Sequence, residues 1–188
     1  MSEKIFVLAS NSFSGGWFVD YCLAKGAEVV GISRSPEAQA VFLPYAANAR
    51  RESFRFFQMD LNQDMPAIVS LIRDFRPDYV VDYAGQGMVA QSWDQPQQWF
   101  KTNVLSKVVL HEELRQLTCL KKYVRFSTPE VYGNTEGDVP ETAPLNPSTP
   151  YAVSHAAIDM SLLAYHRQYG FPVALTRATN VFGPHQQL

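Results

Sequence analysis

Short runs of β-branched and aromatic residues alternate along the chain with longer segments in which apolar residues recur at helical spacing. The short runs predict strands over residues 4–8, 28–32, 54–58, 79–83, 123–126 and 172–176. The longer segments predict helices over residues 13–25, 66–75, 95–117 and 151–169. Gly26 and Gly170 stand where the first and last helices would end. Strands that alternate with helices are typical of βαβ units, so the expected fold is α/β, a doubly wound parallel sheet.

Two segments add detail to this pattern. In the helix predicted over 95–117, Phe100, Val104, Val108 and Leu114 form an apolar set at helical spacing. Residues 128–150 are rich in proline, glycine, asparagine and threonine, and predict a loop over a site. Ligands of doubly wound sheets bind beyond the carboxyl ends of the strands. We therefore expect candidate binding and catalytic residues directly after each strand.

Composition and charge narrow the class of protein. The 188 residues are 46% hydrophobic and 18% charged, which suits one globular domain over residues 1–188. A net charge of −2 and the lack of a basic run make nucleic acid an unexpected partner. Neither of the two cysteines has metal-binding or redox spacing, and no apolar run approaches about 20 residues. We expect no metal, no membrane partner and a cytoplasmic location.

The turn after the first strand reads Ala9-Ser10-Asn11-Ser12-Phe13-Ser14-Gly15-Gly16. Backbone amides at a helix N-terminus bind anions, and the short polar side chains of Ser10, Asn11, Ser12 and Ser14 could hydrogen-bond a phosphate. The alternative is a polar helix cap without a ligand. Position after the first strand of a βαβ unit favours a dinucleotide site.

The second strand is followed by Ser33-Arg34-Ser35. A dinucleotide site specific for NAD places an acidic residue here, whereas an arginine accommodates the 2′-phosphate of NADP. The sequence therefore favours NADP over NAD as the cofactor; the alternative is a solvated arginine.

Tyr151 and His155 are four residues apart at the start of the last helix, so both point to one region. A tyrosine serves as a base at neutral pH only if a nearby cation stabilises its phenolate. A neutral histidine could hydrogen-bond a ribose but would activate Tyr151 less than a lysine. A His155→Lys variant is expected to keep cofactor binding and to lower the pH at which oxidation sets in.

Several segments together resemble the extended short-chain dehydrogenase/reductase superfamily, in its NAD(P)-dependent epimerase/dehydratase family. The turn after the first strand resembles TGxxGxxG, with Ala9, Ser12 and Gly15 at the glycine positions. The tyrosine pair resembles YxxxK, with His155 at the lysine. Further matches are residues 83–92 to AAESHVDRS, 102–104 to TNV, 127–133 to STDEVYG and 177–184 to RxxNxxGP. The STDEVYG-like segment is most similar to nucleotide-sugar 4,6-dehydratases of the GDP-mannose or dTDP-glucose type.

The resemblance implies an NAD(P)-binding Rossmann fold and roles for particular residues. The implied cycle is oxidation at C4 of a nucleotide-linked hexose, loss of water across C5 and C6, and hydride return to C6. Tyr151 would be the acid/base beside His155, Thr128 the ligand of the 4-hydroxyl, and Glu130 the base at C5. Substrate contacts would come from Gln86, Thr128 and Asn180. Cofactor contacts would come from Ala9, Ser10, Asn11, Ser12, Phe13, Ser14, Gly15, Ser33, Arg34, Ser35, Asp60, Leu61, Tyr83, Ala84, Asn103, Tyr151 and His155.

Departures from the family pattern leave alternatives open. Pro129 stands where dTDP-glucose dehydratases place an aspartic acid, and proline can donate no proton. Glu130 or a water would then protonate the leaving hydroxyl, or the protein is a 4-epimerase or 4-ketoreductase, or a non-catalytic NAD(P)-binding protein. Glu130 could also be a solvated loop carboxylate. Family members continue past the position of Leu188 to complete a substrate-binding lobe, so most of that lobe is expected to be absent. The family also implies a homodimer through the helices at 95–117 and 151–169.

Overall fold

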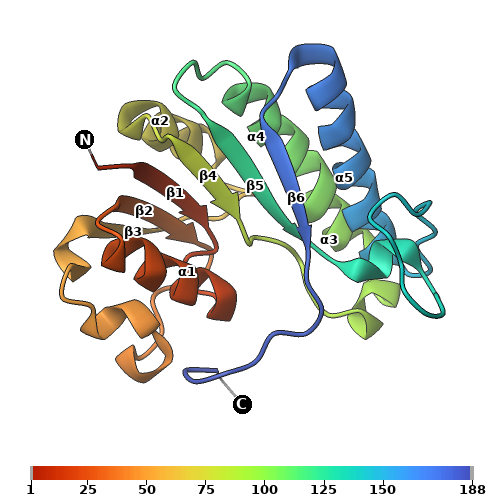
Figure 1. Ribbon diagram of the computed structural model, residues 1–188, viewed down its shortest axis with the longest axis horizontal. Coiled ribbons are helices and arrows are strands. Elements are labelled where there is room, and N and C mark those ends of the chain that lie inside the picture. Colours follow the sequence, from red (N-terminus) through yellow and green to blue (C-terminus); the bar gives the residue numbers. More distant parts are fainter. Residues whose placement is uncertain (1, 187–188) are drawn as a thin grey trace.

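The computed structural model describes residues 2–186, and Met1, Gln187 and Leu188 lie outside the described part. Its centre is a six-stranded parallel sheet in the order β3-β2-β1-β4-β5-β6 (Figure 1). The strands are β1 (Lys4–Leu8), β2 (Glu28–Ser33), β3 (Phe54–Gln58), β4 (Tyr79–Asp82), β5 (Lys122–Ser127) and β6 (Val173–Arg177). Each predicted strand is present, with ends that differ by a residue or so. The prediction of a doubly wound parallel sheet is confirmed.

Helices cover both faces of the sheet (Figure 1). On one face, α1 (Phe13–Ala24) and the 3-10 turn Pro44–Ala47 pack on β1 and β2 around Val7, Val29 and Tyr45. On the other face lie α2 (Met65–Phe75), α4 (Ser106–Leu114) and α5 (Pro150–Tyr169). Their core includes Phe6, Ile68, Leu110, Tyr123 and Leu162. Among the described helices, none is long and apolar enough to cross a membrane.

The helix predicted over 95–117 is continuous in the chain but is not uniform. It consists of α3 (Pro96–Phe100), a π-helical turn (Lys101–Leu105) and α4. Of the apolar set proposed for it, Leu114 is buried, at 1% exposure, whereas Phe100 is 37% exposed. Asn103, Lys107 and His111 are instead fully buried against the sheet. The buried face therefore combines these polar residues with Leu110 and Leu114, and the prediction of an apolar face was wrong at the three polar positions.

Capping residues explain the bounds of α5. The Thr149 hydroxyl accepts a hydrogen bond of 3.1 Å from the Ala152 amide, and Pro150 occupies the first helical position. Gly170 ends the helix in the left-handed conformation, with φ of 66°. The helix therefore carries Tyr151 in its first turn and His155 one turn later, both held by a defined N-terminus.

The segment between β5 and α5 is mostly irregular, as predicted, but it begins with a 3-10 turn over Pro129–Tyr132. Val131 and Tyr132 in this turn pack on Ala156 of α5, and Val139 and Leu145 cover them. This small cluster fixes the start of the segment against α5. Thr128 and Glu130 are thereby held next to the helix that carries Tyr151.

Candidate functional site

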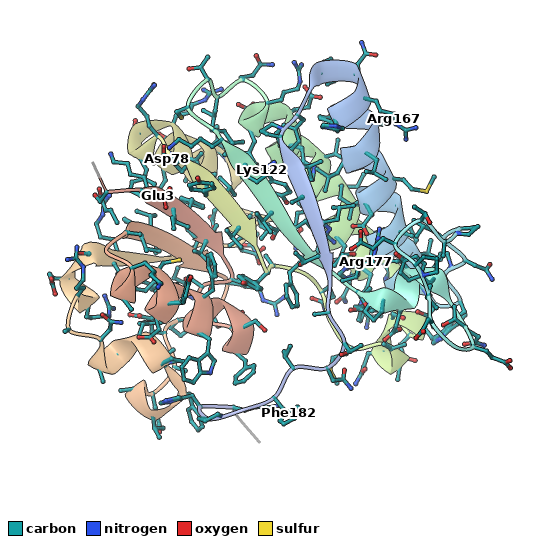
Figure 2. All side chains as sticks on the ribbon, in the orientation of Figure 1. Glu3, Asp78, Lys122, Arg167, Arg177 and Phe182 are labelled. Atoms are coloured by element: carbon teal, nitrogen blue, oxygen red, sulfur yellow. The ribbon has the colours of Figure 1, made fainter. Side chains whose placement is uncertain are left out.

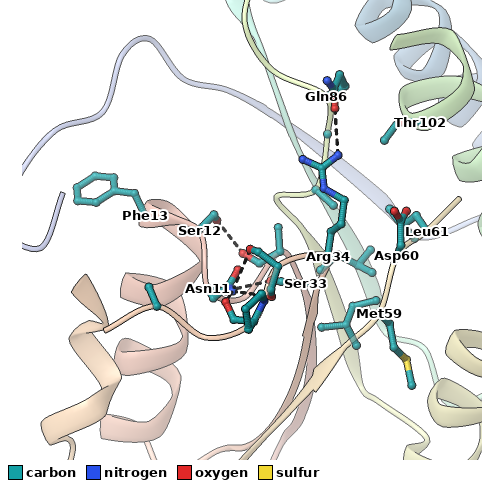
Figure 3. Close-up of a pocket in the computed structure, with 18 of the residues that line it drawn as sticks. Asn11, Ser12, Phe13, Ser33, Arg34, Met59, Asp60, Leu61, Gln86 and Thr102 are labelled. Atoms are coloured by element: carbon teal, nitrogen blue, oxygen red, sulfur yellow. Dashed lines mark hydrogen bonds between the residues drawn. The ribbon is translucent and has the colours of Figure 1, made fainter. Parts of the chain in front are cut away.

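A cavity of about 500 Å3 lies at the carboxyl ends of β1, β2, β3 and β4, next to the N-terminus of α1 (Figure 3). The chain leaves β1 toward one face of the sheet and β4 toward the other, so these neighbouring strands form a switch point. The volume is in the range of small-molecule and cofactor sites. This is where a doubly wound sheet binds its ligand.

The turn after β1 shows why its residues must be small. Ala9 has φ of 60°, a left-handed conformation in which glycine carries no steric penalty. A methyl group added at Gly15 would lie 2.1 Å from the carbonyl oxygen of Ala9. Gly15 is therefore required by the close approach of α1 to this turn, whereas Ala9 occupies its conformation at a cost.

Ser12 replaces a family glycine and caps α1 instead. Its hydroxyl accepts a hydrogen bond of 3.1 Å from the Gly15 amide and donates one of 2.7 Å to the carbonyl of Ala9. In the described part of the chain, the amides of Phe13 and Ser14 have no hydrogen-bond acceptor. The first turn of α1 also contains no acidic residue. These amides and the positive end of the helix dipole can therefore hold an anion at the mouth of the cavity.

Ser10 does not contribute its side chain to this anion site. The hydroxyl is fully buried, has no hydrogen-bond partner among the described residues, and lies against Gly31 of β2. Its amide is also occupied, because it donates to the carbonyl of Ile32 at 3.1 Å. The expected role of Ser10 as a phosphate ligand is therefore wrong; Ser10 packs the turn against β2.

The end of β2 forms the second wall. Arg34 extends across the cavity, and its Nη1 is 3.5 Å from Gln86 Oε1 (Figure 3). Asn11 fixes the following segment, since its side-chain amide donates to the carbonyls of Ser35 and Pro36 at 3.1 and 2.8 Å. The first carboxylate after β2, that of Glu37, is taken by Arg51 at 3.1 Å. Arg34 is thus the charged side chain that this strand directs to the cavity.

The third wall comes from β3 and from the π-helical turn. Asp60 accepts the amide of Asn62 at 2.8 Å, and the Asn62 side chain donates to the Thr102 hydroxyl at 3.0 Å. Asn103 holds the segment after β4, because its side chain accepts the Gln86 amide at 2.7 Å. Asn62 and Thr102 line the cavity and were missed as site residues. The TNV match had pointed to this turn, but no local signal marked Asn62.

The proposed acid/base Tyr151 faces the start of the segment after β5. The Thr128 hydroxyl and the negative charge of Glu130 both lie close enough to the Tyr151 phenol to influence its ionisation. Burial raises the pKa of Tyr151 above 10; Glu130 adds to the rise, whereas Thr128 and Arg125 oppose it. Thr128 and Glu130 therefore lie near the Tyr151 phenol.

His155 lies behind Tyr151, with the two rings 4.6 Å apart. A methyl group at Gly85, a residue that lines the cavity, would be 3.9 Å from His155 Nε2. Burial lowers the pKa of His155 to about 3, and the charges of Arg125 and Lys107 contribute. The histidine is therefore neutral at the inner end of the cavity.

Beneath His155 is a buried network of charged side chains that the sequence did not suggest. Asp82 of β4 pairs with Lys107 of α4 and with Arg125 of β5, and all three are fully buried. Arg125 also pairs with Asp159 of α5 at 3.3 Å. Arg177, at the end of β6 (Figure 2), reaches Asp159 at 3.2 Å. The network ties three strands and two helices together directly under the proposed reactive residues.

The structure thus divides the predicted site residues into those that line the cavity and those that do not. The lining residues are Ala9, Asn11, Ser12, Phe13, Ser33, Arg34, Ser35, Asp60, Leu61, Ala84 and Gln86. Gly15, Asn103 and His155 support its walls. Ser14 and Tyr83 face a second depression beside Phe182 (Figure 2), and the exposed Asn180 lies just before it. Thr128, Glu130 and Tyr151 form the separate cluster described above.

This arrangement defines a class of protein, a Rossmann-fold dinucleotide-binding domain. Residues 5–188 match the model of the NAD dependent epimerase/dehydratase family. The chain is 30% identical over 198 residues to a probable dTDP-glucose 4,6-dehydratase of Sinorhizobium fredii, covering 96% of this chain and 54% of the relative.

Solved structures give the same result. DesIV, a dTDP-glucose 4,6-dehydratase of Streptomyces venezuelae solved with NAD, is 30% identical with a TM-score of 0.84, covering 97% of this chain and 57% of that one. The UDP-glucose 4-epimerase of Thermotoga maritima with UDP-glucose is 28% identical with a TM-score of 0.84, covering 98% and 58%. The chain belongs to the NAD-dependent epimerase/dehydratase family. It spans about half the length of the curated relative described above.

Proposed function

We propose that this chain is the cofactor-binding domain of a nucleotide-sugar 4,6-dehydratase. The observation that carries the proposal is the convergence of a phenol, a hydroxyl and a carboxylate at Tyr151, Thr128 and Glu130. A 4-epimerase needs the tyrosine, but it has no step for a carboxylate at C5. The complete reaction is proposed for this domain together with any substrate-binding part that accompanies it.

In the proposed reaction, Tyr151 takes the proton of the C4 hydroxyl while Thr128 hydrogen-bonds to the same oxygen. A nicotinamide dinucleotide held in the cavity would supply hydride transfer, from C4 and back to C6. With C4 a ketone, the C5 proton is acidic enough for Glu130 to remove it. Pro129 occupies the first position of its 3-10 turn and donates no proton, so Glu130 passes this proton to the departing C6 hydroxyl, which leaves as water. Hydride return to C6 is matched by a proton from solvent at C5, and Tyr151 releases the C4 hydroxyl proton to solvent.

The test incubates the protein with cofactor and with dTDP-glucose, GDP-mannose or CDP-glucose, and follows the product by mass spectrometry. Loss of one water from a substrate is the expected result. Glu130→Gln should abolish this loss and keep cofactor binding, whereas Glu136→Gln, an exposed carboxylate of the same segment, should change neither. An interconverted hexose with no mass change would instead establish a 4-epimerase.

We also propose that the cofactor is NADP. The cavity, the amides of Phe13 and Ser14 and the cation of Arg34 suit an adenosine with a pyrophosphate and a 2′-phosphate. The nearest carboxylate after β2 is that of Glu37. It pairs with Arg51 and accepts a hydrogen bond from the Tyr45 hydroxyl, so it is not positioned to bind a ribose diol. DesIV carries NAD, which makes NAD the alternative.

Isothermal titration with each dinucleotide separates the two cofactors. NADP⁺ is expected to bind about tenfold more tightly than NAD⁺, and Arg34→Gln should remove the difference by weakening NADP⁺ alone. Arg50→Gln, which also removes an arginine from the α1 side of the sheet but outside the cavity, is the control. Tighter binding of NAD⁺ by the unaltered protein would contradict the assignment.

We further propose a homodimer that packs through α3, α4 and α5, and a cytoplasmic location. The outer surfaces of these helices expose Leu105 (64%), Val109 (50%) and Met160 (59%). Analytical ultracentrifugation of the unaltered protein and of a Leu105→Glu variant tests the dimer, since the charge should convert it to a monomer. The two free cysteines suit a reducing compartment.

A further inference from the structure

His155 and Arg125 make a direct contact that determines which ring nitrogen carries hydrogen. Arg125 Nη2 is 3.1 Å from His155 Nδ1, and both residues are buried, at 0% and 6% exposure. A guanidinium carries only donors and keeps its proton. Nδ1 must therefore accept, which leaves the hydrogen of the neutral ring on Nε2.

The other ring nitrogen lies beside Gly85, a residue of the cavity wall. Gly85 lines the cavity, and its side-chain position is 3.9 Å from His155 Nε2. Any larger residue at this position would begin to fill the gap between the imidazole and the cavity. The Nε2–H group is thus the end of His155 that lies next to the cavity wall.

We propose that Arg125 is a positioning residue that fixes His155 as a neutral Nε2–H donor to the cofactor. The site then uses a fixed hydrogen bond at the position where the family lysine places a charge. The positive charge lies one layer deeper, on Arg125 of β5. This inference rests on the proposed function for its cofactor, but the state of the imidazole can be measured without one.

The surroundings of His155 keep this arrangement over a wide pH range. The charged and titratable groups around it are Asp82 from β4, Lys107 from α4, Arg125 from β5, and Tyr151 and Asp159 from its own helix. Asp82 and Asp159 both pair with Arg125, at 3.3 Å in each case, and so orient the guanidinium toward the ring. A second proton on His155 would place an N–H donor against the Arg125 donor. His155 should therefore remain neutral where an ordinary histidine titrates.

Nitrogen-15 NMR of the histidine rings in the unaltered chain tests the first half of the proposal. We expect His155 Nδ1 to show the shift of an unprotonated nitrogen and Nε2 that of a protonated one, without change from about pH 5 to about pH 8. His155→Leu assigns the signals. A ring with hydrogen on Nδ1, or one that titrates in this range, would overturn the proposal.

A double-mutant cycle on NADP⁺ affinity tests the second half. Arg125→Lys keeps the positive charge for Asp82 and Asp159 but loses the planar guanidinium, and we expect about tenfold weaker binding. His155→Leu should cost about the same, and the double variant no more than either single one, because Arg125 acts through His155. Losses that multiply to about a hundredfold would show that Arg125 acts independently and would refute the inference.

Different results would refute the proposed function and the proposed role of Arg125. An Nε2–H imidazole in a protein that binds neither dinucleotide would refute the proposed function and leave the Arg125–His155 contact as described. A protein that binds dinucleotide while His155 carries its hydrogen on Nδ1 would refute this inference alone. Circular dichroism of each variant establishes that the sheet is intact before its affinity is compared.

Discussion

Replacing Lys107 by methionine removes one charge from the buried network while nearly preserving side-chain volume. Lys107 and Asp82 are both fully buried, and the Lys107 ammonium contacts Asp82 Oδ1. Without it, this oxygen keeps only the Ala84 amide at 3.0 Å, and Arg125 becomes the one full positive charge paired with the carboxylate. Breaking a buried pair on one side costs about 3–5 kcal/mol. For a chain of 188 residues, this corresponds to a fall in Tm of about 10 °C.

Urea unfolding followed by circular dichroism measures this loss, and Lys101→Met is the matched control. Lys101 lies in the same helix but is exposed, so its replacement should change the free energy of unfolding by less than about 0.5 kcal/mol. A Lys107→Met, Asp82→Asn double variant removes both charges and should recover most of the loss. If Lys107→Met and Lys101→Met lowered the free energy of unfolding equally, the stabilising role of the buried network would be refuted.

The stability that the Lys107→Met variant loses should depend on pH in a predictable way. Burial would raise the pKa of Asp82, but the charges of Lys107 and Arg125 outweigh it and hold the pKa below 3.8. The stabilisation from Asp82 is therefore present above its unfolded pKa of about 3.9 and is lost as the pH falls through the lower folded value. Without Lys107, the buried Asp82 carboxylate destabilises the folded protein. This destabilisation disappears when the carboxylate is protonated. The difference in stability between the two proteins should narrow toward about pH 4.

Three further predictions concern the cavity and its reactive residues. Ala9→Gly removes the steric cost of the left-handed conformation and should raise the Tm by about 1–3 °C in a thermal scan, with NADP⁺ affinity unchanged. A lower Tm would contradict the backbone strain inferred at Ala9. Gly15→Ala places a methyl group 2.1 Å from a backbone oxygen and should cost about 2 kcal/mol or more in urea unfolding, with loss of cofactor binding in titration. Burial raises the pKa of Tyr151 above 10, so oxidation should increase into alkaline pH. His155→Lys should shift this increase to lower pH in a pH–rate profile, because a cation stabilises the phenolate; an unmoved profile would disprove the role of this pair.

The order of elements and the strands could be predicted because each has its own local pattern. The cap of α5 shows this well, since Thr149, Pro150 and Gly170 mark both of its ends in the sequence. The position of the cavity could also be predicted, because it follows from the first βαβ unit and not from any single glycine. Ala9 and Ser12 keep the turn although both differ from the family pattern.

The polar layer under the site could not be predicted for two physical reasons. Lysine and histidine are rarely fully buried, so Lys107 and His111 read as exposed positions of an amphipathic helix. Their partners are also distant in sequence, as Asp82 and Arg125 show, and a single sequence contains no sign that they meet. The π-helical turn then shifts the buried face by an amount that a regular helical repeat does not contain.

That turn makes the length of this helix as important as its composition. Deleting one residue between Lys101 and Leu105 would restore a regular α-helix, because a π-helical turn holds one residue more than an α-helical turn. Trp99 would stay in phase with α4, but the turn that presents Asn103 would be lost and Asn103 would release the Gln86 backbone. A deletion in the exposed stretch 134–138 breaks no such contact, so protein engineers can shorten that loop but should leave the helix at its present length.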